Sequence, residues 1–501
     1  MLVAVFTGLL LSLLISILVN PTGQRPRLPG LYALLAGSGW WLVLFGLVCL
    51  LSQRPYFSMA FVVVWHGVLL AVNHAKFAAL KEPFILQDFE YFTDALRHPQ
   101  LYVPFFGVAK TVALLAAGAV AIGAFLWLET PLHQSGDGLL LPVASLATGI
   151  LASLAAWRIR PELTLDPTKD MRQTGLIALL HSHLAEYWQA RKRTMPKPAD
   201  NWPEFAPGKP KPNLVLVQSE SFFDPRSCYS FIEPSVLTNW DEHKKQAANS
   251  GQLDVPAWGA NTVRTEAAVL AGLSPGALGI HQYNPYRRLA KQPTSSLASH
   301  LRAQGYETVC IHPYPASFYF RHRIMPALGF DHFIDIAAFS ESDRCGQYIG
   351  DQAVGNKIRD YLENTDKPVF IFAITMENHG PLHLEQPEPD AGKKRYTRPP
   401  GGAVSDLSVY LRHLENADQM LKQTTNALEA ANRSGSLCWY GDHVPIMADV
   451  YRDHGEPAPT TPWLIWTTET SKNTRAGDTA NQQPLPAHGL AKHWLTTLIQ
   501  D

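Results

Sequence analysis

Carboxylate and imidazole side chains follow three apolar, strand-like segments of this 501-residue sequence. Glu220 follows the first segment, His379 the second, and the adjacent pair Asp442 and His443 the third. Carboxylates together with imidazoles suit a divalent ion such as Zn²⁺, Mn²⁺ or Mg²⁺. Each residue alone is more often a helix cap or a satisfied polar group. Their shared position at strand ends favours a metal site over that alternative.

A candidate nucleophile lies in the segment GANTVRTEAAVLAGL, residues 259–273. A glycine-containing loop there precedes Thr262, and an apolar helical pattern follows it. A hydroxyl at a helix N-terminus lies among unpaired backbone N–H groups that favour a phosphate oxyanion. Thr is a poor nucleophile unless it is activated, for example by a metal. The alternative role for Thr262 is a simple helix cap, although Asn261 could be the cap instead.

The segments that must position these residues predict a doubly wound, mainly parallel α/β sheet. Near-continuous apolar runs are typical of strands buried on both faces of a parallel sheet, and helical patterns at 295–306 and 407–431 separate some of them. In such folds the site gathers at the carboxyl ends of the strands. The predicted strands are 213–218, 307–312, 368–375, 436–441 and 462–467.

Charge is distributed unevenly along the chain. Only 13 of its 85 Lys, Arg, Asp and Glu residues lie in residues 1–157. Apolar runs of bilayer length there predict about five transmembrane helices, the first an anchor rather than a cleaved signal peptide. The runs are 1–20, 31–52, 57–75, 106–128 and 139–157. Frequent Gly, Ala and Ser in the last two predict close helix packing. The segment 76–105 fits either an interfacial helix or a connecting loop.

The predicted organisation has three parts: a transmembrane domain over 1–157, an amphipathic helix and linker over 158–212, and an extracytoplasmic catalytic domain over 213–501. A net charge of -1 and a hydrophobic content of 46% argue against nucleic-acid binding and against disorder. The five cysteines form no metal-binding spacing, so we expect small buried side chains, with one disulfide left open.

Several motifs together resemble the signature set of the lipoteichoic acid synthase-like phosphoglycerol transferases, a family of the alkaline phosphatase/sulfatase superfamily. These motifs are QSESF (218–222), GANTVRTE (259–266), SFYFR (317–321), MENHGP (376–381) and GDH (441–443). The order of elements matches as well: membrane helices, an amphipathic linker and a catalytic domain. The resemblance covers essentially the whole chain. Each motif alone is weak, but the set together is specific.

The resemblance implies a metal-binding set and a nucleophile. Thr262 rather than Thr265 takes the nucleophile role, because the family places this residue four positions before a Glu, here Glu266. One divalent ion (Mn, Zn or Mg) is implied, and a second is left open. The implied metal ligands are Glu220, Thr262, Asp442 and His443.

The resemblance also implies residues that bind substrate. Arg321 and His379 fall where the family contacts the substrate phosphate or glycerol. Tyr319 stands where the family can carry a tryptophan, which makes that contact less certain. His454, just beyond the metal pair, is a further candidate for lining the site.

The implied activity is a two-step transfer at the inner membrane. Thr262 attacks the headgroup phosphorus of a phosphatidylglycerol-like phospholipid, and diacylglycerol leaves. A hydroxyl of an envelope glycan or polymer then attacks the phosphothreonine ester. With five spans and a cytoplasmic N-terminus the catalytic domain lies outside, although most basic loop residues would then also lie outside, against the usual positive-inside distribution.

Four alternatives remain at this point. A sulfatase activity ranks low because no cysteine begins the C/S-x-P-x-R motif of those enzymes. A phosphoethanolamine transferase uses the same Thr–metal chemistry and is the second candidate, although such enzymes often carry several disulfides. A phosphodiesterase with water as the acceptor is not distinguished by sequence. A non-catalytic membrane scaffold is disfavoured because every implied catalytic and metal-binding residue is present.

Overall fold

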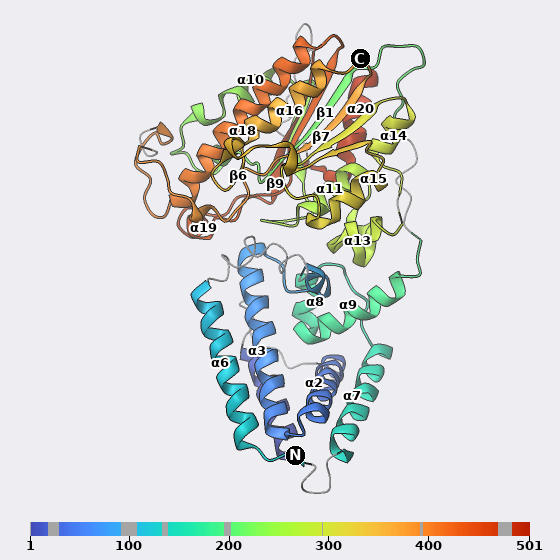
Figure 1. The fold of residues 1–501 in the computed structure, drawn as a ribbon, viewed down its shortest axis with the longest axis vertical. Helices are drawn as coiled ribbons and strands as arrows, with labels where there is room; N and C mark the ends of the chain where they lie inside the picture. The colour runs from blue at the N-terminus through green and yellow to red at the C-terminus, as the bar shows by residue number, and fades with distance from the viewer. Residues whose placement is uncertain are drawn as a thin grey trace. The chain divides into compact units, whose positions relative to one another are not determined.

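The chain forms two compact units, Met1–Arg193 and Thr194–Asp501 (Figure 1). The computed structural model describes residues 2–18, 30–91, 108–132, 139–194, 202–292, 294–390, 394–468 and 483–500. The domain boundaries expected at 157 and 212 stay predictions.

The N-terminal unit is helical. Its longer helices are α1 (Leu2–Leu18), α2 (Leu31–Ser52), α3 (Pro55–Leu80), α6 (Val108–Leu128), α7 (Leu140–Arg158), α8 (Pro167–Thr174) and α9 (Leu176–Ala190). Within the described ranges, α2, α3 and α7 are long and apolar enough to cross a membrane, and Leu2–Ser16 and Ala116–Leu128 are shorter apolar helices. Each of the five predicted runs therefore contains an apolar helix, and three of these reach membrane-spanning length.

Helices α2 and α7 pack closely through glycines. A Cβ atom at Gly149 would lie 2.6 Å from the backbone nitrogen of Val43, and one at Gly39 would lie 2.5 Å from Ser153 Oγ. Both distances are shorter than real Cβ contacts, so only glycine fits at these positions. The close packing predicted from the small residues of 139–157 is confirmed for α7.

The segment 76–105 begins inside a helix, because α3 continues to Leu80. Lys76 Nζ then forms ion pairs with Glu82 Oε1 at 2.9 Å and with Asp88 Oδ2 at 2.7 Å. These contacts anchor a short 3₁₀ turn, η1 (Leu86–Tyr91), against the end of α3. Residues 92–105 lie outside the described residues.

The C-terminal unit is built on an eight-stranded sheet in the order β10-β2-β9-β8-β1-β7-β3-β4. Strands β1, β7, β3, β4 and β8 run parallel in adjacent pairs. The five predicted strands are all present, and a mainly parallel α/β sheet is confirmed. The strands are β1 (Asn213–Ser219), β2 (Asn249–Asp254), β3 (Glu307–Ile311), β4 (His332–Ile334), β7 (Val369–Ile374), β8 (Gly435–Gly441), β9 (Thr460–Thr467) and β10 (Leu485–Pro486).

Strand β9 departs from the parallel arrangement. It runs antiparallel to β8 and to β2. Its apolar sequence predicted a strand buried on both faces, which is correct, but burial on both faces does not determine strand direction. The prediction of a parallel orientation was therefore wrong for β9.

Helices cover both faces of the sheet (Figure 1). Alternate residues of β1 point to opposite faces, so Val215 and Val217 belong to one core and Leu214 and Leu216 to the other. The first core contains α10 (Thr238–Gln246), α16 (Asp351–Glu363) and α18 (Ser405–Ala430). The second contains α11 (Thr262–Ala271), α13 (Pro285–Leu289), α14 (Leu297–Ala303), α15 (Arg321–Ala327) and α20 (Leu490–Gln500).

The five cysteines, all within the described residues, are free. Cys49, Cys310 and Cys438 are buried, as expected for small apolar side chains. Cys228 is exposed and Cys345 is partly exposed, so the expectation of burial was wrong for Cys228.

Candidate active site at the carboxyl ends of the strands

Strand pairing brings together the motifs that follow β1 and β8. Strands β1 and β8 are parallel neighbours, and Ser219 pairs in register with Gly441. The next residues of the two strands, Glu220 and Asp442, therefore leave the sheet side by side. Strand β7 lies on the other side of β1 and brings His379 to the same end of the sheet.

Glu220, Asp442 and His443 form a buried cluster of three potential metal ligands. Their ligand atoms lie within 4.8 Å of one another. His443 Nε2 is 3.5 Å from Glu220 Oε1 and 3.3 Å from Asp442 Oδ2. Asp442 Oδ2 is buried and accepts no hydrogen bond of normal geometry. A buried carboxylate oxygen without a donor is costly, so this cluster is suited to a cation.

The charges of the cluster perturb one another. Burial, followed by the charge of Glu220, raises the pKa of Asp442 to about 7, although His443, the Ser221 amide and the Thr262 hydroxyl act in the opposite direction. Burial opposes the charged form of His443, but Asp442 and Glu220 outweigh it and raise the pKa of this imidazole. The negative charges of two buried carboxylates repel one another, and a bound divalent cation would neutralise them.

Thr262 is the first residue of α11 and lies beside the Asp442 carboxylate. Asn261 precedes it with a left-handed backbone (φ 67°), and its side chain makes no capping hydrogen bond. Thr265 Oγ1 donates to the Asp442 carbonyl oxygen at 2.9 Å. Helix α11 is thereby tied to the end of β8, which holds the Thr262 hydroxyl next to the cluster.

Ser221 supports the cluster and was not singled out by sequence. Its backbone N–H donates to Asp442 Oδ1 at 2.8 Å, and its hydroxyl donates to Glu220 Oε1 at 2.8 Å. Metal-binding carboxylates are commonly oriented by such outer contacts. The signal was present in the motif QSESF, where a second serine follows the Glu.

Arg321 is almost completely buried, and Glu266 pairs with it. Arg321 Nε and Nη2 donate to the two carboxylate oxygens of Glu266 at 3.1 and 2.7 Å. The guanidinium carbon lies 5.3 Å from the ring centre of Tyr319. Tyr319 and Arg321 of the motif SFYFR thus lie against one another, and Glu266 is an additional partner of Arg321. Their predicted contacts with substrate stay predictions.

His379 is half-buried at the end of the loop after β7. Its Nδ1 donates to the Gly380 carbonyl oxygen at 2.6 Å, and the Tyr348 hydroxyl lies 3.3 Å from the same nitrogen. Because Nδ1 carries the proton, Nε2 is the nitrogen with a free lone pair. This imidazole can therefore accept a proton from a reacting group.

His454 ends α19 (Ala448–His454) and lies among aromatic rings. Its ring centre is 5.1 Å from that of Phe231 and 6.0 Å from that of Tyr229. Within the described residues these are its ring contacts. Its predicted role in lining the site stays a prediction.

A second acidic group, which sequence reasoning missed, lies near Glu220. Glu377 accepts hydrogen bonds from the Asp351 backbone N–H at 2.7 Å and from Asn416 at 2.5 Å. Burial, then Glu377, and more weakly Glu220 raise the pKa of Asp351 well above its ordinary value. Glu377 stood in the motif MENHGP, but nothing in the sequence marked Asp351.

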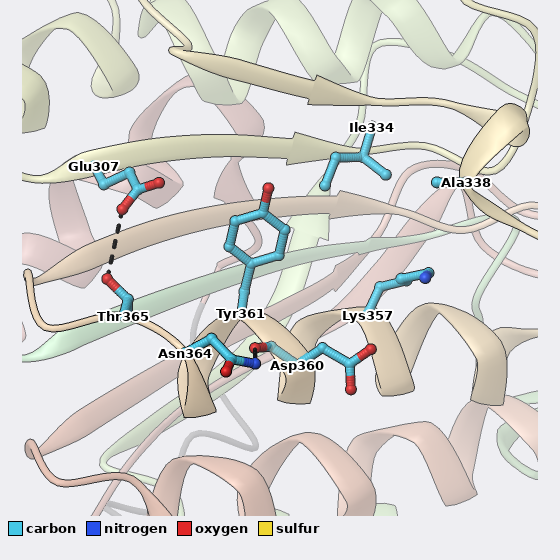
Figure 2. Close-up of a pocket in the computed structure, with 8 residues that line it drawn as sticks. All are labelled: Glu307, Ile334, Ala338, Lys357, Asp360, Tyr361, Asn364 and Thr365. Carbon is cyan, nitrogen blue, oxygen red and sulfur yellow. Dashed lines mark hydrogen bonds between the residues drawn. The ribbon is translucent and has the colours of Figure 1, made fainter.

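A separate pocket of about 300 Å³ lies between the edge of the sheet and α16 (Figure 2). Figure 2 shows Tyr361 pointing from α16 toward the sheet, and Glu307 facing Thr365, whose hydroxyl donates to it at 3.5 Å. None of the predicted site residues lines this pocket. The candidate site is therefore the cluster at the strand ends rather than this pocket.

Comparison with known proteins agrees with the fold of the C-terminal unit. Residues 212–498 match the family model Sulfatase. A capsular polysaccharide biosynthesis protein, RkpI, of Rhizobium meliloti is 32% identical over 51% of this chain and 45% of its own length. Lipoteichoic acid synthase 1 of Bacillus subtilis is 28% identical over 28% of this chain and 22% of its own. The matched region thus spans less than half the length of these relatives.

The likeness to one of the solved structures extends over both units. That structure is the integral membrane protein lipooligosaccharide phosphoethanolamine transferase A of Neisseria meningitidis, with a TM-score of 0.54 and 12% identity, over 95% of this chain and 96% of that chain. At this identity the likeness shows the fold: apolar N-terminal helices followed by the sulfatase-type domain. With three helices of spanning length, it indicates a membrane protein. Because the family model matches more than half of its residues, the chain belongs to the Sulfatase family, within the alkaline phosphatase superfamily.

Proposed function

We propose that the chain is a phosphotransferase that moves a phosphoglycerol headgroup from a phospholipid to a cell-envelope glycan or polymer, through a phosphothreonine at Thr262. The observation that carries this proposal is the Thr262 hydroxyl at the start of α11, beside the buried carboxylate of Asp442. The names of two relatives, a capsular polysaccharide biosynthesis protein and a lipoteichoic acid synthase, support an envelope polymer as the acceptor.

The donor set fits one divalent ion. Glu220, Asp442 and His443 would hold it, with the Thr262 oxygen as a fourth ligand, and the buried Asp442 Oδ2, which accepts no hydrogen bond of normal geometry, supports this assignment. Carboxylate and imidazole ligands are compatible with Mn²⁺, Zn²⁺ or Mg²⁺. Such an ion, when bound, lowers the pKa of a coordinated hydroxyl and offsets the charge of phosphoryl oxygens. A second ion stays a prediction.

The proposed reaction has two balanced steps. In the first, a bond forms between Thr262 Oγ and phosphorus, the bond from phosphorus to the diacylglycerol oxygen breaks, and the threonine proton ends on that oxygen. In the second, an acceptor hydroxyl oxygen bonds to phosphorus, the threonine–phosphorus bond breaks, and the acceptor proton returns to Thr262. Two displacements at one phosphorus need no other reactant.

Other residues of the site supply orientation and proton transfer. We assign the guanidinium of Arg321 to the phosphate oxygens, because a planar fork matches their geometry. His379 carries the proton between the reacting oxygens through Nε2, the nitrogen that its bond to Gly380 leaves free. Tyr319, stacked on Arg321, borders the same phosphate position.

A lipid donor accounts for the attachment of this domain to apolar helices. We place the chain in the inner membrane as a multi-pass protein with its catalytic domain on the extracytoplasmic side, where envelope polymers are assembled. The apolar helices α2, α3 and α7 support the membrane location. Nucleic acid is not expected as a partner.

The donor is tested with the full-length protein in mixed micelles with Mn²⁺. Fluorescent phosphatidylglycerol and phosphatidylethanolamine are supplied separately, and release of labelled diacylglycerol is measured. We expect release from phosphatidylglycerol that Thr262→Ala abolishes. Thr238→Ala is the matched control, since Thr238 is an exposed first residue of another helix, α10. Release from phosphatidylethanolamine alone would replace the proposal with phosphoethanolamine transfer, and release from neither lipid would refute it.

A further inference from the structure

Arg321 is fixed in the interior by partners on several sides. Arg321 is 2% exposed and Glu266 is fully buried. Nε and Nη2 of Arg321 donate to the two oxygens of Glu266, and Nη1 donates to His312 Nε2 at 3.0 Å. The rings of Phe318 and Tyr319 lie 5.9 and 5.3 Å from the guanidinium carbon. The plane and the rotation of this side chain are therefore both determined.

The partners of Arg321 are themselves fixed. Glu266 also accepts a hydrogen bond from the Tyr286 hydroxyl and one from Gln218 Nε2 at 3.4 Å. His312 donates from Nδ1 to the Ile374 carbonyl oxygen at 3.3 Å, which leaves Nε2 as the acceptor for Arg321. Burial, followed by the Arg321 charge, holds the pKa of His312 well below its ordinary value. A buried network with every member paired is rigid.

The pattern of contacts leaves one edge of the guanidinium for a ligand. A guanidinium carries five N–H groups. Glu266 takes the edge formed by Nε and one hydrogen of Nη2, and His312 takes one hydrogen of Nη1. One hydrogen on Nη1 and one on Nη2 are not used by these contacts, and two such N–H groups can act as a fork. A fork of this kind matches two oxygens of a phosphate.

Glu266 also belongs to the helix that carries the proposed nucleophile. Thr262 and Glu266 are four residues apart on α11, so they lie one turn apart on the same side of that helix. One rigid element therefore holds the nucleophilic hydroxyl at its start and the partner of Arg321 one turn later.

We propose that Glu266 is a positioning residue that presents the tip of Arg321 to the substrate phosphate and sets its distance from Thr262. This inference rests on the proposed function, because it assumes that Arg321 binds the transferred phosphate. It goes further because it gives Glu266 a role in substrate binding, beyond that of a purely structural ion pair. A structural pair would affect stability only, whereas a positioning residue also controls phosphate affinity and turnover.

The first test compares Glu266→Gln with Glu415→Gln in the full-length, Mn²⁺-loaded protein. Glu415 is the matched control because it accepts the same two-pronged hydrogen bonds, from Arg395 at 3.0 and 2.8 Å. Inorganic phosphate binding is measured by calorimetry, and diacylglycerol release and the unfolding midpoint are measured in parallel. We expect Glu266→Gln to weaken phosphate binding about tenfold or more, since a charge-assisted contact is disturbed. Glu415→Gln should lower only the unfolding midpoint.

The second test does not depend on the folding of Glu266→Gln. Tyr286→Phe keeps the ion pair and removes one hydrogen bond to Glu266. We expect it to lower turnover several-fold, with a modest fall in the unfolding midpoint because a buried hydrogen bond to a charged group is lost. Added guanidinium should restore part of the turnover lost in Arg321→Ala, because Glu266 can hold the free cation. The same addition should not restore Arg321→Ala/Glu266→Gln.

Three results would overturn the inference: unchanged phosphate affinity in Glu266→Gln, wild-type turnover in Tyr286→Phe, or equal guanidinium rescue with and without Glu266. Failure of the proposed function would look different. In that case the wild-type protein releases no diacylglycerol, while the difference in phosphate affinity between Glu266→Gln and Glu415→Gln can still be measured.

Discussion

Asp442→Asn should stabilise the metal-free protein and destabilise the metal-loaded one. Without a cation, Glu220 and Asp442 are two buried carboxylates whose oxygens lie within 4.8 Å. Two like charges at that distance repel by about 3 kcal/mol at an effective dielectric constant of about 20. The substitution removes this repulsion and also removes a metal ligand, so the order of stabilities should reverse when Mn²⁺ is added.

The local geometry accepts an amide. Oδ1 of the new Asn can keep the hydrogen bonds from the Ser221 and His443 amides, now 2.8 and 2.9 Å long. Its Nδ2 takes the place of Oδ2, which lies 3.3 Å from His443 Nε2. Because His443 Nδ1 donates to the Val444 carbonyl oxygen, neutral His443 can accept from that amide. The substitution therefore keeps these contacts and removes one buried negative charge.

The effect should depend on pH. The pKa of Asp442 is raised from its ordinary 3.8 to about 7. In the metal-free protein, the Asp442 carboxyl therefore binds its proton more tightly in the folded state than in the unfolded state. The contribution of Asp442 to the free energy of unfolding is therefore fully present at low pH and is lost as pH rises to about 7. Between the two pKa values, each pH unit changes the free energy of unfolding by about 1.4 kcal/mol. The free energy of unfolding of the apo wild-type protein should therefore fall by about 2 kcal/mol from about pH 5.5 to 8.5. The raised pKa of His443 acts in the same direction.

The assay is thermal unfolding of the chelator-treated full-length protein in detergent, followed by tryptophan fluorescence. At about 2–4 °C per kcal/mol, apo Asp442→Asn should unfold several degrees above apo wild type at about pH 8.5, and the gap should narrow at about pH 5.5. Saturating Mn²⁺ should raise the wild-type midpoint more than that of the variant. An apo variant less stable than apo wild type at the higher pH would refute the reasoning.

Three further predictions concern the supporting contacts. Ser221→Ala should weaken metal affinity about 10–100-fold, because it removes the hydroxyl that donates to Glu220; a titration of the apo protein checks this, and unchanged affinity would contradict it. His379→Gln should lower turnover about 10²–10⁴-fold with little change in unfolding midpoint, since proton transfer is lost; near-normal turnover would exclude His379 from proton transfer. Gly149→Leu should lower the unfolding midpoint of the N-terminal unit by forcing α7 from α2, at a cost of about 1–3 kcal/mol; Gly118→Leu, where a Cβ meets no atom within 4 Å, is its control.

The position of the metal-ligand cluster followed from local sequence alone. Apolar runs marked the strands, and polar residues just beyond them had to meet at one edge of a parallel sheet. Glu220, Asp442 and His443 were found in this way, and Thr262 from the start of its helix. The orientation of β9 was not predictable, because an apolar run is the same in either direction.

The contacts that support the site depend on long-range packing. Glu266 and Arg321 are 55 positions apart in sequence, and Asp351 meets Glu377 across 26 positions. Buried charged residues give no local pattern of their own, and they become recognisable only when their partners are placed. Nearness in sequence to Asp442 likewise did not reveal which rings His454 packs against.

Intact-mass analysis can detect the proposed phosphothreonine intermediate at Thr262 itself. The full-length Mn²⁺-loaded protein is incubated with phosphatidylglycerol without an acceptor, and its mass is compared with that of Thr262→Ala. We expect a glycerophosphate ester on the wild-type protein, mapped by fragmentation to Thr262 and absent from the variant. An equal adduct on Thr262→Ala, or an unmodified wild-type protein that still releases diacylglycerol, would contradict it.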